Sequence, residues 1–138
     1  MKDKIFIGGC LCGELRYEGR NPIDAGYCHC RICQRSTGAP LLAWVTFPLA
    51  DFSFVKGEPT IYRSSPRGVR NFCSNCGTQI AFHGDETHGQ IDVNIGSLDD
   101  PAQAVPEYHI WVGSRVPWLH IDDELPRYTD DGPASTSS

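Results

Sequence analysis

Residues 73–77 read Cys-Ser-Asn-Cys-Gly, two cysteines separated by two residues and followed by a glycine. A loop of this kind folds back on itself, because the glycine supplies the unusual backbone angles that close it. Both thiols then point to one place, as they do in a zinc-knuckle loop. The stretch therefore predicts one half of a tetrahedral metal site, and the other half must come from elsewhere in the chain.

The 138-residue chain has seven cysteines in three tight groups: Cys10 and Cys12; Cys28, Cys30 and Cys33; Cys73 and Cys76. Seven ligands divide as four plus three. Four thiolates make a closed, structural zinc site, whereas three leave one position for water or a substrate, as catalytic zinc sites do. Pairing the first group with the last would join the amino end to the middle of the chain and stabilise the fold. Cys28, Cys30 and Cys33 then remain as a separate set of three ligands.

Disulfide bonds are the first alternative. The cysteine count is odd, and after the charged start only Ile5, Phe6 and Ile7 precede two glycines, too short an apolar run for a signal peptide or membrane anchor. We therefore expect a cytoplasmic protein whose thiols stay reduced. Metal binding is favoured over disulfides, with redox pairing of Cys73 and Cys76 as an open alternative.

Composition and charge indicate one compact, acidic domain. The formal net charge is −5 and 40% of the residues are hydrophobic. The acidic balance disfavours a nucleic-acid surface, so we expect small-molecule or protein partners and no membrane partner, with the oligomeric state left open. We expect the domain to span residues 1–128. Residues 129–138, rich in Ser, Thr and Asp, are predicted to form a disordered tail.

The chain is cut into short segments by 14 glycines and 10 prolines, and it has no long amphipathic pattern. This is typical of many-stranded β folds, so we predict a mainly β protein with few short helical turns. One helical turn or two should follow Cys30 and end near Gly38, with another turn around 101–104. The predicted strands are 14–18, 41–47, 52–56, 60–64, 68–72, 78–82 and 90–95.

Side chains that alternate along an extended segment point to one face at every second residue, so Cys10 with Cys12, and Cys28 with Cys30, could each bind one ion from a strand. Three thiolates against a dication leave a net charge of about −1, which acidifies water poorly. A thiol entering the open position would be held as thiolate, ready to attack an electrophilic carbon such as an aldehyde. This favours carbon–sulfur bond chemistry. In the alternative, His29, His83 or another side chain closes the site.

The chain resembles the glutathione-dependent formaldehyde-activating enzyme family, whose domain also occurs in centromere protein V. The similar segments follow the family's order: GGCLCGELRY, YCHCRICQRSTGAP, FCSNCGTQI, IDVNIGSLDDP and HIWVGSRVPWLHIDDELPRY. The resemblance implies a β-tent of small antiparallel sheets held together by zinc. It implies two zinc ions per chain, a structural ion on Cys10, Cys12, Cys73 and Cys76 and a catalytic ion on Cys28, Cys30 and Cys33.

The resemblance also implies a carbon–sulfur lyase that works in the reverse direction and condenses glutathione with formaldehyde to S-hydroxymethylglutathione. The family often has Arg directly after the third cysteine of the triplet, where this chain has Gln34 and then Arg35. Arg35 is our first candidate for a glutathione contact, because it lies two residues after a metal ligand, Cys33. The cations considered for the two glutathione carboxylates are Arg31, Arg35, Arg63, Arg67, Arg70 and Arg115.

Two other functions stay open: a non-catalytic, zinc-stabilised binding module, and a redox or zinc-relay protein that releases zinc on oxidation. Several polar residues receive structural interpretations instead of catalytic ones. His29 should point away from the metal, and His109 and His120 should be satisfied core histidines. The aspartates at 92, 99 and 100 are interpreted as turn residues. The tryptophans at 44, 111 and 118 are interpreted as core or cleft walls.

Overall fold

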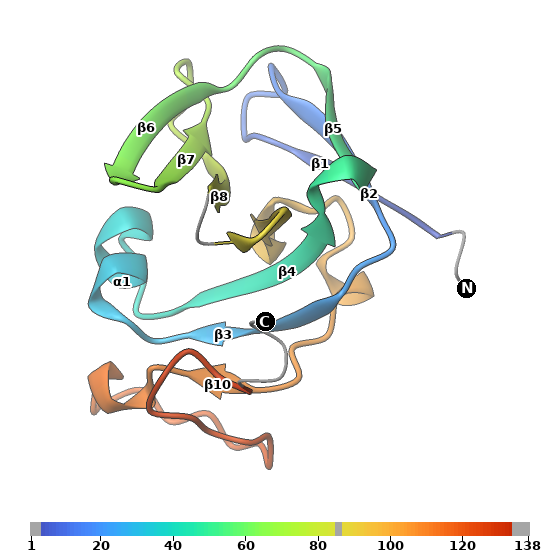
Figure 1. Ribbon diagram of the computed structural model, residues 1–138. Helices are drawn as coiled ribbons and strands as arrows, with labels where there is room; N and C mark the ends of the chain where they lie inside the picture. The colour runs from blue at the N-terminus through green and yellow to red at the C-terminus, as the bar shows by residue number, and fades with distance from the viewer. Residues whose placement is uncertain (1–3, 85–86, 134–138) are drawn as a thin grey trace.

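The computed structural model describes residues 4–84 and 87–133 and is mainly β, as predicted (Figure 1). The strands are β1 (Ile5–Gly9), β2 (Arg16–Arg20), β3 (Asp24–Cys28), β4 (Leu42–Pro48), β5 (Phe52–Lys56), β6 (Thr60–Ser65), β7 (Gly68–Phe72), β8 (Gln79–Gly84), β9 (Gln90–Asn94) and β10 (His109–Ile110). The helix α1 covers Arg31–Thr37. Short 3-10 helices cover Leu49–Asp51, Ile95–Ser97, Pro101–Gln103 and Val112–Ser114. In the described residues no helix is long and apolar enough to cross a membrane.

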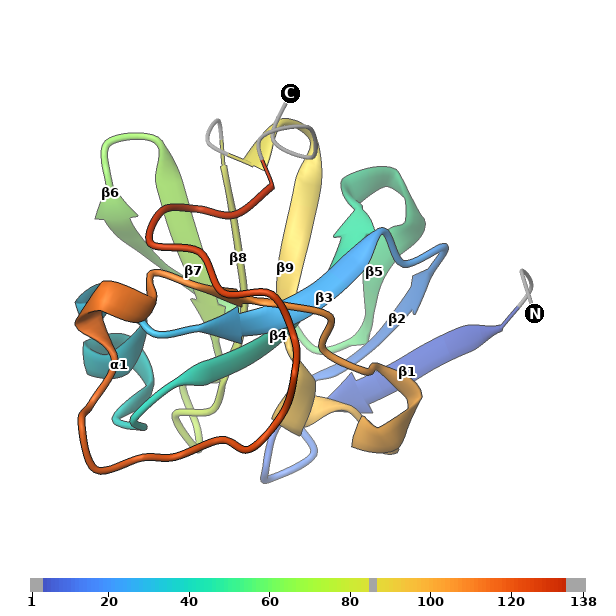
Figure 2. The ribbon, with the colours of Figure 1, turned by 90° about the horizontal axis from the view of Figure 1, so that it is seen from below.

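The strands form two sheets, one of three strands in the order β1-β2-β5 and one of seven in the order β10-β3-β4-β9-β8-β7-β6. Neighbouring strands are antiparallel, except that β10 pairs with β3 in parallel. This pairing brings the segment after residue 108 back across β3, as the orange and red ribbon in Figure 2 shows. The large sheet therefore has one edge made by β10, a strand far along the chain from its partner β3.

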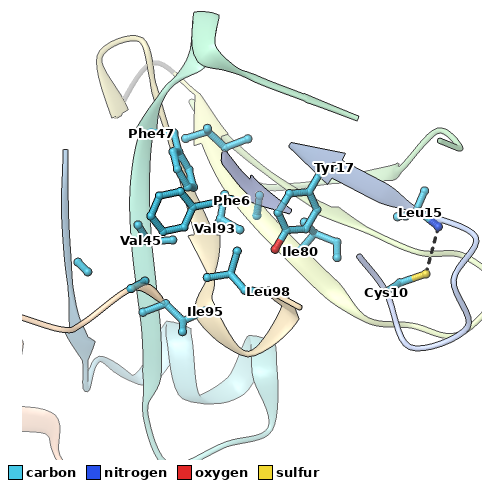
Figure 3. Packing of buried hydrophobic residues seen from close by; sticks show 14 of the residues in the cluster. Phe6, Cys10, Leu15, Tyr17, Val45, Phe47, Ile80, Val93, Ile95 and Leu98 are labelled. Carbon is cyan, nitrogen blue, oxygen red and sulfur yellow. Dashed lines mark hydrogen bonds between the residues drawn. The ribbon is translucent and has the colours of Figure 1, made fainter. Parts of the chain in front are cut away.

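The hydrophobic core lies between the small sheet and one face of the large sheet (Figure 3). Phe6 of β1 packs edge-on against Phe47 of β4, with ring centroids 5.4 Å apart, and Tyr17 and Phe47 are completely buried. Along β4 and β9 the core side chains are those at 45, 47, 91 and 93. Because side chains alternate along a strand, the residues between them face the opposite side of the large sheet.

Local sequence explains where α1 begins and ends. Cys30 is its N-cap, since its Sγ accepts a hydrogen bond from the Cys33 N–H. Gly38 ends the helix in the left-handed conformation, with φ of 71°, and its N–H donates to the Gln34 carbonyl. The turn at Pro101–Gln103 starts with Asp100, whose carboxylate accepts from the Ala102 N–H. Both predicted helical segments are confirmed.

Residues 129–133, the first half of the segment predicted as a tail, pack against the segment that contains β10. The Trp111 N–H donates to the Asp130 carbonyl at 3.1 Å, and Gly132 is buried beside Tyr108 and Ile110. Residues 134–138 lie outside the described residues. The carboxyl-terminal part of the described chain therefore takes part in the structure around β3.

Candidate metal centres

Four thiols from two turns form the first cysteine cluster: Cys10, Cys12, Cys73 and Cys76. Their sulfurs all lie within 4.8 Å of one another, with 3.6 Å between Cys10 and Cys12 and 3.8 Å between Cys12 and Cys73. Zinc–sulfur bonds of about 2.3 Å in a tetrahedron place sulfurs about 3.8 Å apart. The cluster can therefore hold a metal ion, and its spacing fits zinc.

Hydrogen-bond donors surround the first cysteine cluster. The Leu15 N–H donates to Cys10 Sγ at 3.2 Å, and the Asn75 side-chain amide donates to Cys12 Sγ at 3.2 Å. Hydrogen bonds from Thr78 lower the pKa of Cys76 to about 5. The Leu11 N–H also donates to Thr78 Oγ1 at 3.0 Å, so the two turns contact each other directly. These donors favour thiolates, the form that binds metal.

The local prediction for this cluster is partly wrong. Cys10 and Cys12 do not lie on an extended strand; they lie in a tight turn after β1, in which the Gly13 N–H donates to the Cys10 carbonyl at 3.2 Å. Gly13 has φ of +85°, which an L side chain rarely adopts. A turn, and not strand alternation, brings the two thiols together.

The cysteine triplet, Cys28, Cys30 and Cys33, is built where β3 passes into α1. Cys28 ends the strand, Cys30 is the extended N-cap residue, and Cys33 lies in the first helical turn, with its sulfur 3.1 Å from that of Cys28. The prediction of an extended segment at Cys28 and Cys30 is confirmed. The sulfurs lie within 4.8 Å of one another, so this group too can hold a metal ion.

The three thiols influence each other's ionisation strongly. Hydrogen bonds from the thiols of Cys28 and Cys33 hold the pKa of Cys30 far below its usual range. The pKa values of Cys28 and Cys33 are raised, chiefly by their thiol partners in the triplet and also by burial. Three thiolates can exist together here only beside a cation that offsets their repulsion. The donor set therefore fits a dication such as zinc.

In the part of the chain that the structure describes, no histidine or carboxylate joins the triplet as a fourth ligand group. His29 points away from the sulfurs, as predicted, and its Nε2 lies 2.9 Å from Nδ1 of His109. His109 is 1% exposed, and its Nε2 lies 3.0 Å from Asp123 Oδ2. The two rings stack at an angle of 24°. His109 is thus the satisfied core histidine that we predicted, and it fixes the residue between two of the cysteines.

The triplet lines a cavity of about 480 Å³ on the face of the large sheet opposite the core. β3, β4 and β9 supply side chains at alternate positions, among them Asp24, Trp44 and Asp92. Tyr108 and Asp131 close it from the carboxyl-terminal side of the described chain. The triplet and several charged groups therefore line the same cavity.

Hydrogen bonds fix the carboxylates of this cavity. Trp44 Nε1 donates to Thr46 Oγ1 at 2.9 Å, and the Thr46 hydroxyl donates to Asp92 Oδ1 at 2.7 Å. Burial raises the pKa of Asp92 to about 6. Tyr108 OH donates to Asp24 Oδ2 at 2.8 Å. The interpretation of Asp92 as a turn residue is wrong, because it lies inside β9 and lines the cavity.

Sequence reasoning missed Asp24, Asp92 and Tyr108 as residues of the site. A signal for Asp92 was present: in residues 91–95 the polar Asp92 and Asn94 alternate with three apolar residues. Such alternation predicts one buried face and one polar face of a strand. Tyr108 had no comparable signal, because it reaches the cavity only through the parallel pairing of β10 with β3.

The arginines considered as ligands of carboxylates are widely separated. Arg70 lines the cavity of the triplet, and it is the one member of that group that does so. Arg35 lies with Arg31 and Trp118 around a separate, shallow hollow beside α1. A role of Arg35 in contacting glutathione therefore stays a prediction. Of the six arginines, Arg70 is placed to contact a carboxylate in the cavity of the triplet.

The sequence model of the glutathione-dependent formaldehyde-activating enzyme family matches residues 5–114, most of the chain. The chain belongs to this family. Within the formaldehyde-activating family it is similar to a Halomonas elongata protein that bears the provisional name glutathione-dependent formaldehyde-activating enzyme. The two are 23% identical over 128 residues, which cover 86% of this chain and 82% of the relative.

A crystal structure of a Rhodobacter sphaeroides protein, solved in a structural genomics programme, has the same fold as this member of the formaldehyde-activating family. The TM-score is 0.60 at 23% identity, and the match covers 88% of this chain and 98% of the other. Family membership suggests an enzyme with glutathione-related activity, and both cysteine clusters fit metal binding.

Proposed function

We propose that this protein is a zinc-dependent enzyme of the carbon–sulfur lyase type, acting on a small thiol and an aldehyde. Glutathione and formaldehyde, the compounds that the family's description names, are the proposed pair, with S-hydroxymethylglutathione as the adduct. The observation that carries the proposal is a cysteine triplet with no fourth ligand among the described residues, lining a cavity that is open to solvent on one side. The first cysteine cluster would hold a structural zinc ion and the triplet a catalytic one.

In the proposed reaction the thiol sulfur bonds to the aldehyde carbon while the carbonyl π bond opens. The proton that the thiol gives up ends on the carbonyl oxygen, so nothing is oxidised or reduced. Zinc bound by the triplet would supply the positive charge that keeps the substrate sulfur as a thiolate at neutral pH. The reverse reaction releases the aldehyde from the adduct.

The chain's own residues fix the metal ligands and shape the cavity in which the reactants would meet. The Cys33 N–H donates to Cys30 Sγ at 3.2 Å and fixes the ligand that begins α1. The buried contact between His29 and His109 holds the backbone between Cys28 and Cys30. The rings of Trp44 and Tyr108, whose centroids are 5.7 Å apart, form a wall of the cavity that limits the access of water.

The proposal also covers where the enzyme works. Both clusters bind metal only as free thiols, and all seven cysteines are unpaired in the structure. A reducing compartment such as the cytoplasm keeps them in that state. The partner that we propose is a small-molecule thiol or its aldehyde adduct, bound by a single domain covering residues 1–128, with Asp131 of the segment packed against it also lining the cavity.

The test is to follow the exchange of isotope-labelled formaldehyde with glutathione by NMR, with zinc counted in the same sample. We expect two zinc ions per chain, one of them released by a mild chelator, and an exchange rate above the spontaneous one that falls back when that ion is removed. Two bound ions without acceleration would overturn the enzyme proposal in favour of a zinc-stabilised binding module. Zinc release by mild peroxide, measured alongside, tests the redox alternative.

A further inference from the structure

Three charged side chains lie in one row across the cavity, away from the cysteine triplet. Across the strands β3, β4 and β9, Asp24 pairs with Thr46, and Thr46 pairs with Asp92. Across β9, β8 and β7, Asp92 pairs with Phe82, and Phe82 pairs with Arg70. Residues paired across neighbouring strands point to the same face of a sheet. Asp24, Asp92 and Arg70, which we call the charged row, accordingly all line the cavity.

The charged row forms no ion pair at contact distance, either between its own members or with another described residue. Arg70 forms no ion pair with any described residue; its guanidinium lies over the Phe82 ring, 4.7 Å from the centroid, and its Nε is buried without a hydrogen-bond partner. The hydrogen bonds to Asp92 and Asp24 come from the neutral hydroxyls of Thr46 and Tyr108. Asp24, Asp92 and Arg70 are all half-buried, and partly desolvated charges are costly unless an opposite charge lies close to them. A charged ligand would supply the opposite charges that the protein does not place beside these side chains.

The order of negative and positive charges along the charged row indicates what kind of ligand fits it. Asp24 and Asp92 influence each other electrostatically, and so do Asp92 and Arg70. Adjacent strands are about 5 Å apart, so two carboxylates and then a guanidinium follow one another at intervals of about 10 Å before the side chains reach inward. An ammonium group beside a carboxylate group complements this order. Both groups occur together on the α-carbon of an amino acid.

The distance to the triplet specifies the rest of the molecule. Cys28 and Asp24 are four residues apart on β3, which corresponds to about 13 Å along the strand. The row between them is uncharged and consists of Gly26, Trp44 and Asn94. In free cysteine the amino group is too close to the sulfur to span this distance. In glutathione the γ-glutamyl group places an ammonium and a carboxylate one peptide link beyond the cysteine.

We propose that the charged row is the binding site for the α-amino acid head of the thiol substrate. Asp92, supported by Asp24, contacts the ammonium group, and Arg70 contacts the α-carboxylate, while the sulfur lies at the cysteine triplet. This inference rests on the proposed function and adds to it the side chains that recognise the zwitterionic head of the proposed substrate, glutathione.

The first test measures binding to the zinc-loaded full-length protein by calorimetry with glutathione and two analogues. Glutaryl-Cys-Gly lacks only the γ-glutamyl amine, and 4-aminobutanoyl-Cys-Gly lacks only its α-carboxylate. Because a charged hydrogen bond contributes about ten- to a hundredfold in affinity, we expect each analogue to bind at least about tenfold more weakly than glutathione. Equal affinities for all three thiols would overturn the assignment of the row.

Substitutions then assign each charge to its partner. Arg70→Gln should weaken glutathione about tenfold or more and leave the affinity for 4-aminobutanoyl-Cys-Gly unchanged, since that thiol has no carboxylate to lose. Asp92→Asn should weaken both thiols that carry the amine and leave glutaryl-Cys-Gly unchanged. Arg67→Gln, at an exposed arginine in the turn after β6, is the matched control. Equal losses for all ligands would contradict these contacts.

The two proposals fail in different ways. If neither glutathione nor Cys-Gly, which lacks the whole γ-glutamyl group, binds to protein carrying two zinc ions, the thiol function itself is wrong and the inference falls with it. If both bind with equal affinity, the thiol function stands and the charged row is not a head-group site. If 4-aminobutanoyl-Cys-Gly binds more tightly than glutathione, Arg70 does not contact a carboxylate.

Discussion

Asp92 carries its charge where the fold surrounds it with protein. Burial raises its pKa from 3.8 to about 6, the Asp24 charge adds to this, and the Thr46 hydrogen bond and the Arg70 charge oppose it. The folded protein therefore binds this proton more tightly than the unfolded chain does. The protonated form of Asp92 therefore adds to the free energy of unfolding at low pH. This contribution decreases as the pH rises from about 4 to 6, and it is absent above pH 6.

Asp92→Asn should consequently stabilise the protein at pH 7.5. The shift corresponds to about 3 kcal/mol, and partial exposure to solvent reduces the expected gain to about 1–2 kcal/mol. Urea unfolding of zinc-loaded wild type and variant should show this gain shrinking as the pH is lowered from 7 towards 5. Asp122→Asn, at an exposed aspartate, is the control and should give a small difference that does not vary with pH. An Asp92→Asn protein no more stable than wild type at pH 7.5 would refute the argument.

At the scale of elements, α1 matters because it presents two of the triplet cysteines. Its length is only seven residues, so its ends decide its stability more than its interior does. Cys30 caps one end with its sulfur, and Gly38 closes the other in a left-handed conformation with open space where a side chain would be. The same sulfur thus serves as helix cap and as candidate metal ligand.

Gly38→Ala should cost about 1 kcal/mol of stability, because alanine pays the full conformational penalty at φ of 71° without any steric clash. Thermal unfolding of the zinc-loaded protein measures the loss. Gly113→Ala is the matched control, since its Cβ would also meet open space and its φ is not in the left-handed range. Equal effects of the two substitutions would show that the helix end does not limit stability.

Most elements could be predicted from turn residues and alternation, including the capped helix. β1, β3 and β10 could not. β1 ends in two glycines, which the sequence suggests as a turn, whereas the Leu15 carbonyl leaves no room for a side chain at Gly9. In β3, the Trp44 ring occupies the space where a side chain at Gly26 would lie. β10 has two residues and exists only through its pairing with the distant β3.

At the scale of the whole molecule, the two cysteine groups differ in how distant the elements are that they join. The first cluster joins the turn after β1, in the small sheet, to the turn between β7 and β8, in the large sheet. The triplet joins β3 only to the helix that directly follows it. The division into four and three could be predicted from cysteine spacing alone. The charged groups of the cavity could not, because they come together through sheet register.

Cys76→Ser and Cys33→Ser should therefore differ sharply. Loss of a structural zinc ion removes about 10 kcal/mol or more, comparable to the whole stability of a domain, so Cys76→Ser should unfold or aggregate. Cys33→Ser should lose one zinc ion per chain and keep the fold. Zinc counting together with circular dichroism decides between these results. Equal damage from both substitutions would contradict the division of labour between the two groups.

One wall of the cavity, with Tyr108, Trp111 and Asp131, comes from a segment whose strand pairing with the large sheet consists of the two residue pairs of β10. The family match ends at residue 114, so part of this wall lies beyond it. Substitutions in the segment change the shape and charge that a substrate meets, while the cysteines and the core between the sheets stay as they are. The shape and charge of the cavity can in this way change during evolution while both cysteine clusters are kept.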